Sequence, residues 1–256
     1  MPSTPVIELP DHDALVDFAR GHPVARWNHS ARRFDRAWGL GEAASFTDHG
    51  RFGHLLLAFG APDDAARLAA EILAGPPAGD LGGFDIVVVP RDSPVSSIDQ
   101  LKWRHDWEWF WTTTMPERRP GEAAVERLDV ADPHVAGELT ELLDVSSPTT
   151  SALPGDPTVD HWYGIRAAER GLVACAAESE RASGSSNLRA IAVHPALRGR
   201  GLGADVTTAV MRAGFEAGLH AVTLGMYSDN ETAARPMYQR LGFQLGQEFA
   251  TYAVSA

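Results

Sequence analysis

The stretch that decides this fold runs from residue 187 to residue 203: Asn187-Leu188-Arg189-Ala190-Ile191-Ala192-Val193-His194-Pro195-Ala196-Leu197-Arg198-Gly199-Arg200-Gly201-Leu202-Gly203. Its first part predicts a strand, and a helix with one apolar face is predicted over 201–218. The first amides of a helix have no internal acceptors, and the helix dipole makes that end partly positive. The glycines admit a phosphate without a Cβ in the way, and Arg198 and Arg200 add charge and forked donors. The stretch therefore predicts a pyrophosphate-binding turn.

Three other interpretations of this turn stay open at this point. A P-loop needs a lysine after its last glycine, and this turn has none. The dinucleotide-binding pattern fits as Gly199-x-Gly201-x-x-Ala204, but residues 194–198 separate the strand from the first glycine. Only about 50 residues follow, too few for the further strand–helix units of that fold. The third interpretation is a plain turn with no ligand.

The rest of the second half predicts a regular order of elements around this turn. We expect a strand over 124–130, a helix over 133–143, a loop over 146–159, strands over 162–168, 172–177 and 187–193, the helix over 201–218, a strand over 221–226, a short helix ending at 242, and one or two strands within 243–254.

Two spaced motifs in this half carry a resemblance to a known family. The first is Val193-His194-Pro195 followed by Arg198-x-x-Gly201-x-Gly203, and the second is Asn230-x-x-Ala233 followed by Tyr238-x-x-Leu241-Gly242-Phe243. Together with the order of elements, they resemble the GNAT superfamily of acyl-CoA N-acyltransferases. The resemblance covers residues 121–256, a little over half of the chain.

The resemblance implies an α/β (α+β) fold, a GNAT-type mixed and mostly antiparallel sheet flanked by helices. It also implies acetyl-CoA as co-substrate, no metal, and transfer of an acetyl group to a primary amine of a small molecule or peptide. Main-chain amides of 199–203 would hold the pyrophosphate, and the amide of Val193 would face the thioester oxygen. The implied coenzyme-binding residues are Ile191, Ala192, Val193, Arg198, Gly199, Arg200, Gly201, Leu202, Gly203 and Asn230.

Tyr238 matches the tyrosine that members of this family use as a general acid, and we expect it to protonate the departing thiolate. The other interpretation is that Tyr238 only packs under the following strand. The general base is unresolved, because Asn187 stands where many relatives have a glutamate; Glu178 and Glu180 are possible substitutes, or a solvated strand end. Asn230 lies eight residues before Tyr238, where relatives commonly have seven, and Pro236 predicts a helix that starts near residue 235.

The first half has no glycine turn of this kind. A strand–helix–strand unit over 51–90 suggests a smaller α/β N-terminal domain over 1–120, one interpretation of which is a degenerate copy of the same fold, as in tandem members of the family. Trp103, His105, Trp107, Trp109 and Trp111 alternate, which predicts one face of a strand, either a core face or an aromatic wall for an acceptor or acyl chain. Residues 115–121 predict a linker before a second domain over 121–256.

The composition of the chain limits which partners and which cellular location we expect. The net charge of −12 argues against nucleic acid and anionic membranes as partners. Cys175, the one cysteine, predicts a buried inert thiol, and the absence of a signal peptide or long apolar run predicts a cytoplasmic protein. The oligomeric state stays open. Beside the acetyltransferase, two hypotheses remain: a non-catalytic acyl-CoA-binding module on the same fold, and a dinucleotide-dependent enzyme.

Overall fold

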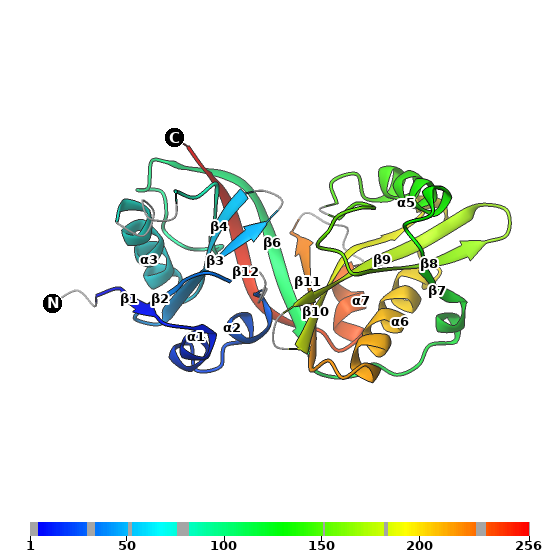
Figure 1. The fold of residues 1–256 in the computed structure, drawn as a ribbon, viewed down its shortest axis with the longest axis horizontal. Helices are drawn as coiled ribbons and strands as arrows, with labels where there is room; N and C mark the ends of the chain where they lie inside the picture. Colours follow the sequence, from blue (N-terminus) through cyan, green and yellow to red (C-terminus); the bar gives the residue numbers. More distant parts are fainter. Residues whose placement is uncertain are drawn as a thin grey trace. The chain divides into compact units, whose positions relative to one another are not determined.

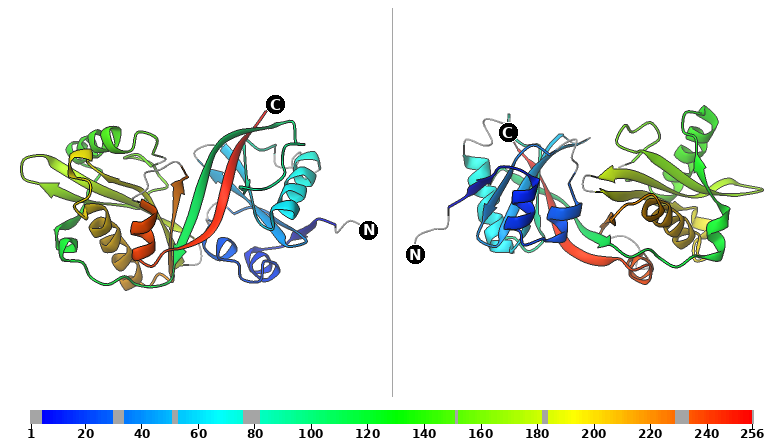
Figure 2. Two further views of the ribbon diagram at one scale, coloured as in Figure 1. Left: turned by 180° about the vertical axis from the view of Figure 1, so that it is seen from behind. Right: turned by 60° about the horizontal axis from the view of Figure 1, so that its bottom comes forward.

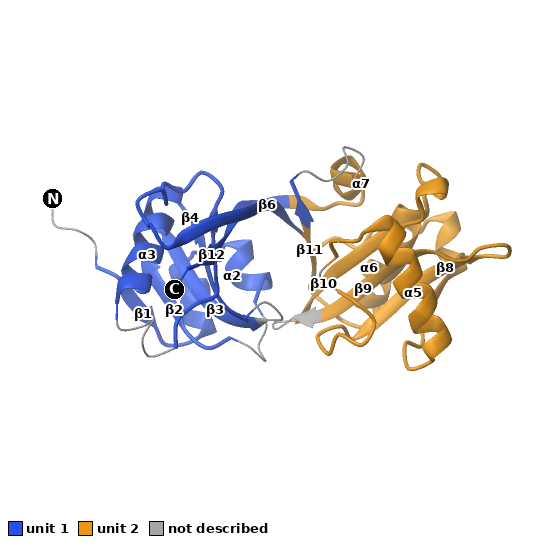
Figure 3. Cartoon of the chain, turned by 90° about the horizontal axis from the view of Figure 1, so that it is seen from above, with its two compact units in different colours: residues 1–110, 226–230, 245–256 blue, residues 111–225, 231–244 orange. Residues whose placement is uncertain are grey.

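The computed structural model describes residues 5–29, 34–50, 53–75, 82–150, 152–181, 184–228 and 234–255. The chain forms two compact units. Unit 1 comprises residues 1–110, 226–230 and 245–256, and unit 2 comprises residues 111–225 and 231–244 (Figure 3). The chain thus returns to unit 1 with its last strand. The functional division at residue 120 that the sequence suggests stays a prediction.

Unit 1 is a sheet with helices packed against it (Figure 1). Its strand order is β1-β2-β3-β4-β5-β12-β6. The elements are β1 (Ile7–Leu9), α1 (His12–Phe18), α2 (Pro23–Trp27), β2 (Ala37–Leu40), β3 (Ala43–Gly50), β4 (Gly53–Gly60), α3 (Pro62–Ala74), β5 (Ile86–Pro90), β6 (Leu101–Thr112) and β12 (Gln244–Val254).

Unit 2 has the strand order β11-β10-β9-β8-β7. Asp132 caps its first α-helix by accepting a hydrogen bond from the amide of His134, and Pro133 occupies the first helical position, where no amide is needed. The elements are the 3-10 helix η1 (Pro120–Ala124), β7 (Val125–Leu128), α5 (Pro133–Ser146), β8 (His161–Ala167), β9 (Gly171–Arg181), β10 (Ser185–Val193), the 3-10 helix η3 (Pro195–Leu197), α6 (Leu202–Glu216), β11 (Ala221–Tyr227) and α7 (Ala234–Arg240).

The two units repeat one topology. In unit 1, β1 to β4 pair antiparallel in succession, and β4 then pairs parallel with β5 across the crossover helix α3. In unit 2, β7 to β10 pair antiparallel in the same way, and β10 pairs parallel with β11 across α6. The predicted fold class, a mostly antiparallel mixed sheet flanked by helices, is therefore confirmed, and the interpretation of the first half as a copy of the same fold agrees with this repeat.

Helices cover both faces of the unit 2 sheet (Figure 2). Trp162, Cys175 and Ala177 pack with the buried leucines of α5. Neighbouring residues of a strand point to opposite faces, so Glu178 faces the other side, where one carboxylate oxygen lies 3.5 Å from the position that a Cβ on Gly214 of α6 would take. The glycine turn before α6 thus opens at one end of a sheet covered on both faces.

Unit 1 is built around α3 in the same way. Its apolar face, with Leu68, Ala69 and Ile72 buried, packs on the sheet residues Leu56 and Val87. The last strand of the chain completes this sheet, because β12 pairs antiparallel with β5 and lies between β5 and β6.

The alternating aromatic residues do lie on a strand, β6, and their burial varies along it. Trp109 is fully buried, and the half-buried Trp107 stacks on Phe249 with ring centroids 4.8 Å apart while its indole donates to the hydroxyl of Thr251. His105 and Trp111 are also half-buried, and Trp103, at the start of the strand, is 61% exposed. Of the alternating set, Trp109 alone is therefore a core residue, so the alternation does not mark a continuous core face.

Residues 115–121, expected to form a linker, contact α6. Arg212 of α6 donates to the carbonyl of Pro116 at 2.8 Å, and Arg118 pairs with Glu216 at 3.1 Å. The prolines of this segment correctly predict an irregular backbone. Composition alone does not predict that two arginines bind this backbone to the helix.

Candidate functional site

The turn between β10 and α6 has the geometry that the sequence predicts. After η3, Gly199 and Gly201 adopt φ values of +76° and +85°, which favour glycine, and Gly201 is the N-cap of α6. No described residue accepts a hydrogen bond from the amides of residues 199–203. A Cβ at Gly199 would meet nothing within 4 Å. The turn is thus an open cradle of main-chain donors at the positive end of a 15-residue helix.

Gly203 lets three elements meet under this cradle. A Cβ at Gly203 would lie 3.4 Å from Cγ2 of Val193 on β10 and 3.5 Å from Sδ of Met237 on α7. The start of α6 is therefore packed closely against the end of β10 and against α7, the helix that carries Tyr238. Asn230, the other residue of that predicted motif, lies outside the described residues.

The edge of β10 is open beyond its first half. Its recorded pairing with β11 runs from Ser185–Ala221 to Leu188–Leu224. The pairing with β9 shifts register between residues 189 and 192, where Ala190 has a φ of +49°. Such a bulge re-aims the strand that contains it.

Beyond the bulge, the direction of one amide is settled. The amide of His194 donates to the carbonyl of Val173 on β9 at 2.9 Å. Successive amides of an extended strand point to opposite sides, so the amide of Val193 points away from β9. Together with the register of the bulge, this leaves the end of β10 with an edge that an extended ligand can pair with.

The two arginines of the turn have different surroundings. Arg198 donates to the carbonyls of Val193 at 3.4 Å and Ser146 at 3.1 Å, so it braces the turn against β10 and the end of α5. Arg200 is exposed. His194 accepts a hydrogen bond from the amide of Ala196 and thereby shapes the turn, as its position predicts.

A third arginine, which the sequence did not single out, belongs to this site. Arg119 bonds through Nε to Oδ1 of Asp205 at 2.6 Å, and its Nη2 lies 3.2 Å from the position of a Cβ on Gly201. Asp205 is buried in the first turn of α6. Nothing in the local sequence pattern points to this contact, because Arg119 and Asp205 lie 86 positions apart in the chain.

Tyr238 is buried on α7, with its ring packed edge-on against Phe243 at a centroid distance of 5.9 Å. Burial raises the pKa of Tyr238 above its ordinary value of about 10. The phenol is therefore protonated at neutral pH and can act as a donor.

The structure describes the side chains of Asn187, at the position where many relatives have a glutamate, and of the candidate base Glu178. The side chain of Glu180 lies outside the described residues. Asn187 is buried and its amide oxygen accepts from the hydroxyl of Thr223 at 3.1 Å. Glu178 is buried on β9 opposite Leu188, the last residue of β10 that pairs with β11, and accepts from the hydroxyl of Tyr163 at 3.4 Å. Burial raises the pKa of Glu178, and the nearby His161 opposes that shift. A carboxyl with a raised pKa accepts protons more readily than an exposed one.

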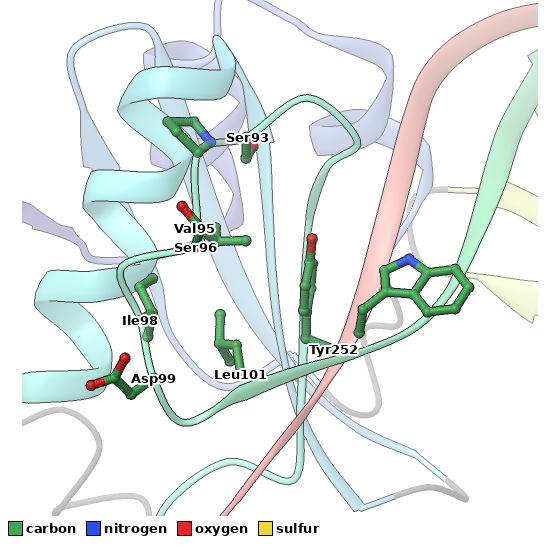
Figure 4. A pocket seen from close by; sticks show the side chains of 9 residues that line it. Ser93, Val95, Ser96, Ile98, Asp99, Leu101 and Tyr252 are labelled. Atoms are coloured by element: carbon green, nitrogen blue, oxygen red, sulfur yellow. The ribbon is translucent and has the colours of Figure 1, made fainter.

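Unit 1 has an open hollow of about 500 Å³ (Figure 4). Its lining combines hydroxyl groups, apolar side chains and two aromatic rings, Trp103 and Tyr252, and includes Asp99. Thus one member of the aromatic alternation, Trp103, does line a hollow. The lining of this hollow includes none of the residues that the resemblance implies for coenzyme binding.

The described residues contain neither a metal-binding cluster nor a membrane-spanning helix. No group of three or more His, Cys, Asp or Glu side chains in the described ranges has an arrangement that suits a metal ion. Likewise, no helix in the described part of the chain is long and apolar enough to span a membrane. Cys175 is buried as predicted, and burial raises the pKa of its thiol to about 12.

Comparison with known proteins gives a family for the second half and a fold for the whole. Residues 138–243 match the acetyltransferase (GNAT) family. A putative GNAT acetyltransferase from Novosphingobium aromaticivorans is 21% identical with a TM-score of 0.54, over 94% of this chain and 97% of its own. A GCN5-related N-acetyltransferase from Kribbella flavida is 17% identical with a TM-score of 0.56, over 94% and 96%. No curated protein matches the sequence.

Proposed function

From the match of residues 138–243 to the GNAT acetyltransferase family we propose that the protein transfers an acetyl group from acetyl-CoA to a primary amine of a small molecule or peptide. The family supports acyl transfer in general; the acetyl group and the amine are our inference. The observation that carries the proposal is the cradle of amides at residues 199–203, at the start of α6, which have no acceptor among the described residues.

The residues fit the phosphates of a coenzyme for three physical reasons. The amides converge at the positive end of a helix, where a pyrophosphate replaces the solvent that they would otherwise bind. Gly199 leaves the approach open, because a Cβ there would have no neighbour within 4 Å. Arg198 and Arg200 add positive charge next to the cradle, in a chain that is otherwise acidic.

The pantetheine arm of the substrate would run along the edge of β10 that β11 leaves unpaired. Ile191, Ala192 and Val193 would pair with its amides as an added strand does. The amide of Val193 points away from β9, so it can donate to the thioester oxygen. A donor fixed in advance stabilises the charge that develops on that oxygen as the amine attacks.

Proton transfers complete the reaction. The attacking amine must lose a proton, and the leaving thiolate must gain one. We assign the second transfer to Tyr238, whose phenol is protonated at neutral pH because burial raises its pKa. A phenol with a raised pKa is a weaker acid than the thiol, with its pKa of about 8.5, so the transfer draws its driving force from acyl transfer to the amine. Glu178 is our candidate for the first transfer, because it is a buried carboxyl with a raised pKa opposite Leu188, where the pairing of β10 with β11 ends.

Thiol release tests this function. The protein is mixed with acetyl-CoA and a panel of amines, amino acids and aminoglycosides, and free CoA thiol is measured, with propionyl-CoA and longer acyl-CoA thioesters as comparison donors. We expect turnover with at least one amine, fastest with the acetyl donor. Calorimetric titration with acetyl-CoA and with NADH accompanies it, and tight NADH binding without acetyl-CoA binding would refute the proposal.

A second function keeps one observation in its favour. Asn187 stands where relatives have a glutamate, and it is bonded to Thr223. A protein that binds acetyl-CoA tightly but releases no thiol with any amine would be a non-catalytic acyl-CoA-binding module on the same fold. The two assays above separate these functions.

A further inference from the structure

The first turn of α6 contains a charge that is out of place for a phosphate site. Asp205 is the fourth residue of the helix and its side chain is buried. A carboxylate near a helix N-terminus stabilises the helix, but here it also repels any phosphate that binds at the same end. A functional site at this position needs that charge neutralised.

Arg119 supplies the neutralising charge and leaves donors to spare. Its Nε is 2.6 Å from Oδ1 of Asp205, and its Nη2 is 3.2 Å from the position of a Cβ on Gly201. A guanidinium has five N–H donors in a fixed fork, so the contact through Nε leaves the Nη groups beside the cradle. The side chain is 37% exposed, which lets a ligand reach it.

Two glycines make room for this arrangement. A Cβ on Gly121 would lie 2.1 Å from Oδ2 of Asp205, and a Cβ on Gly201 would crowd Arg119. The ion pair is therefore held between η1 and the start of α6 at fixed positions. Arg198, in contrast, donates to main-chain carbonyls, and Arg200 extends from the exposed part of the turn.

We propose that Arg119 is a further binding residue for the pyrophosphate of the acyl-CoA substrate, positioned by Asp205. The inference rests on the proposed function and goes beyond it, because the residue comes from the segment before η1 and not from the glycine turn. The guanidinium offers paired N–H groups to phosphate oxygens, a geometry that arginine provides and lysine does not.

The test compares substrates with and without phosphates. Calorimetry gives the Kd for acetyl-CoA of the wild type, Arg119→Ala, Arg119→Gln and the control Arg118→Ala, a neighbouring arginine that is 68% exposed and pairs with Glu122 and Glu216. A charged hydrogen bond contributes about 1.5–3 kcal/mol, so we expect both Arg119 variants to bind acetyl-CoA about 10- to 150-fold more weakly. Arg118→Ala should change the Kd less than about threefold.

Further readouts exclude a merely structural role. Turnover of S-acetyl-pantetheine, which lacks the phosphates, should be the same in the wild type and in Arg119→Gln, a variant that can keep a hydrogen bond to Asp205. The weakening should persist with 3′-dephospho-CoA, because the pyrophosphate is still present. Added salt should weaken acetyl-CoA binding less in Arg119→Gln than in the wild type, since one phosphate contact is gone.

The outcomes separate the two proposals. If the wild type does not bind acetyl-CoA, the proposed function fails and this inference falls with it. If the wild type binds and the Arg119 variants bind equally well, only this inference is overturned. Equal losses with acetyl-CoA and S-acetyl-pantetheine would also overturn it, because they indicate a distorted site rather than a lost phosphate contact. A weakening that vanishes with 3′-dephospho-CoA would overturn the assignment to the pyrophosphate.

Discussion

Burial determines the protonation state of several titratable side chains in this protein. Tyr238, Glu178 and Cys175 are all buried, and burial raises the pKa of each because it penalises the ionised form. The consequences differ with chemistry. A phenol that stays protonated is a donor, a carboxyl with a raised pKa is a candidate proton acceptor, and a thiol with a pKa near 12 is unreactive.

Tyr238→Phe tests the donor. Removing a general acid typically costs about 10²- to 10⁴-fold in rate, so we expect kcat for acetyl transfer to fall at least about 10²-fold while the KM for acetyl-CoA changes little. Steady-state kinetics of the wild type and the variant measure this. Tyr252→Phe, which removes a hydroxyl in unit 1, is the control and should retain its kcat. A variant as active as the wild type would leave Tyr238 with the packing role alone.

Glu178→Gln tests the buried carboxyl through stability. The folded-state pKa of Glu178 is raised above its unfolded value of about 4.3. Between those two pKa values the folded state binds more protons than the unfolded state, so stability falls as pH rises through that window. The variant has nothing to ionise there, and we expect its stability relative to the wild type to increase from pH 4 upward. Urea unfolding of both proteins across the pH series is the measurement, and parallel curves would contradict the assignment.

At the scale of elements, glycine and packing decide what each strand–helix junction can do. The β10–α6 junction contains η3 and two glycines with positive φ, and its amides are open. The equivalent β4–α3 junction in unit 1 is a single residue, Ala61, followed by Pro62 at the first helical position. The C-terminal strand shows the effect of packing. The fully buried side chain of Phe249 anchors β12 in unit 1.

Phe249→Ala should destabilise unit 1. Truncating a buried phenylalanine costs about 3–5 kcal/mol, and here it also removes the stacking on Trp107. We expect a lower urea midpoint for the unfolding of unit 1, followed by tryptophan fluorescence. The control on the same strand is Leu245→Ala, whose side chain is 41% exposed and should change stability by less than about 0.5 kcal/mol. Equal effects of the two variants would mean that β12 is not anchored by its buried face.

For the whole molecule, one topology occurs twice, but the two copies differ at the junction where the proposed function places the coenzyme. In unit 1, Pro62 removes a donor from the start of α3, and Asp63 and Asp64 place negative charge in its first turn. Asp64 also accepts from the amide of Glu42 at 2.9 Å, so its carboxylate is fixed there. These features disfavour a phosphate at the position where unit 2 offers its cradle.

The expected stoichiometry is therefore one acetyl-CoA per chain. Calorimetric titration of the full-length protein should give a single site, because among the described residues it is the β10–α6 junction of unit 2 that combines open amides with arginine side chains. Two sites per chain, with a second site that survives Arg119→Gln, would show that unit 1 also binds the coenzyme.

Local patterns were sufficient for most elements. The helix of the expected strand–helix–strand unit over 51–90 corresponds to α3, that over 133–143 to α5 and that over 201–218 to α6, because each has a regular apolar face and a proline or glycine at its boundary. The helix expected from residue 235 is α7, which begins at Ala234. Short elements gave no usable pattern: β1, α2 and β2 have three to five residues and were not expected. Their stability comes from neighbours distant in the sequence, not from local periodicity.

What the sequence determined by itself is therefore local: the strand, the glycine turn and the helix over 187–218, with the two motifs that carry the resemblance to the GNAT family. Tertiary structure alone decided which distant groups join that turn. Arg119 reaches Asp205 across 86 positions of the chain, and β12 leaves α7 to complete the sheet of unit 1. The physical reason is that periodicity and turn chemistry act over a few neighbouring residues, whereas ion pairs and strand partners are chosen by packing in three dimensions.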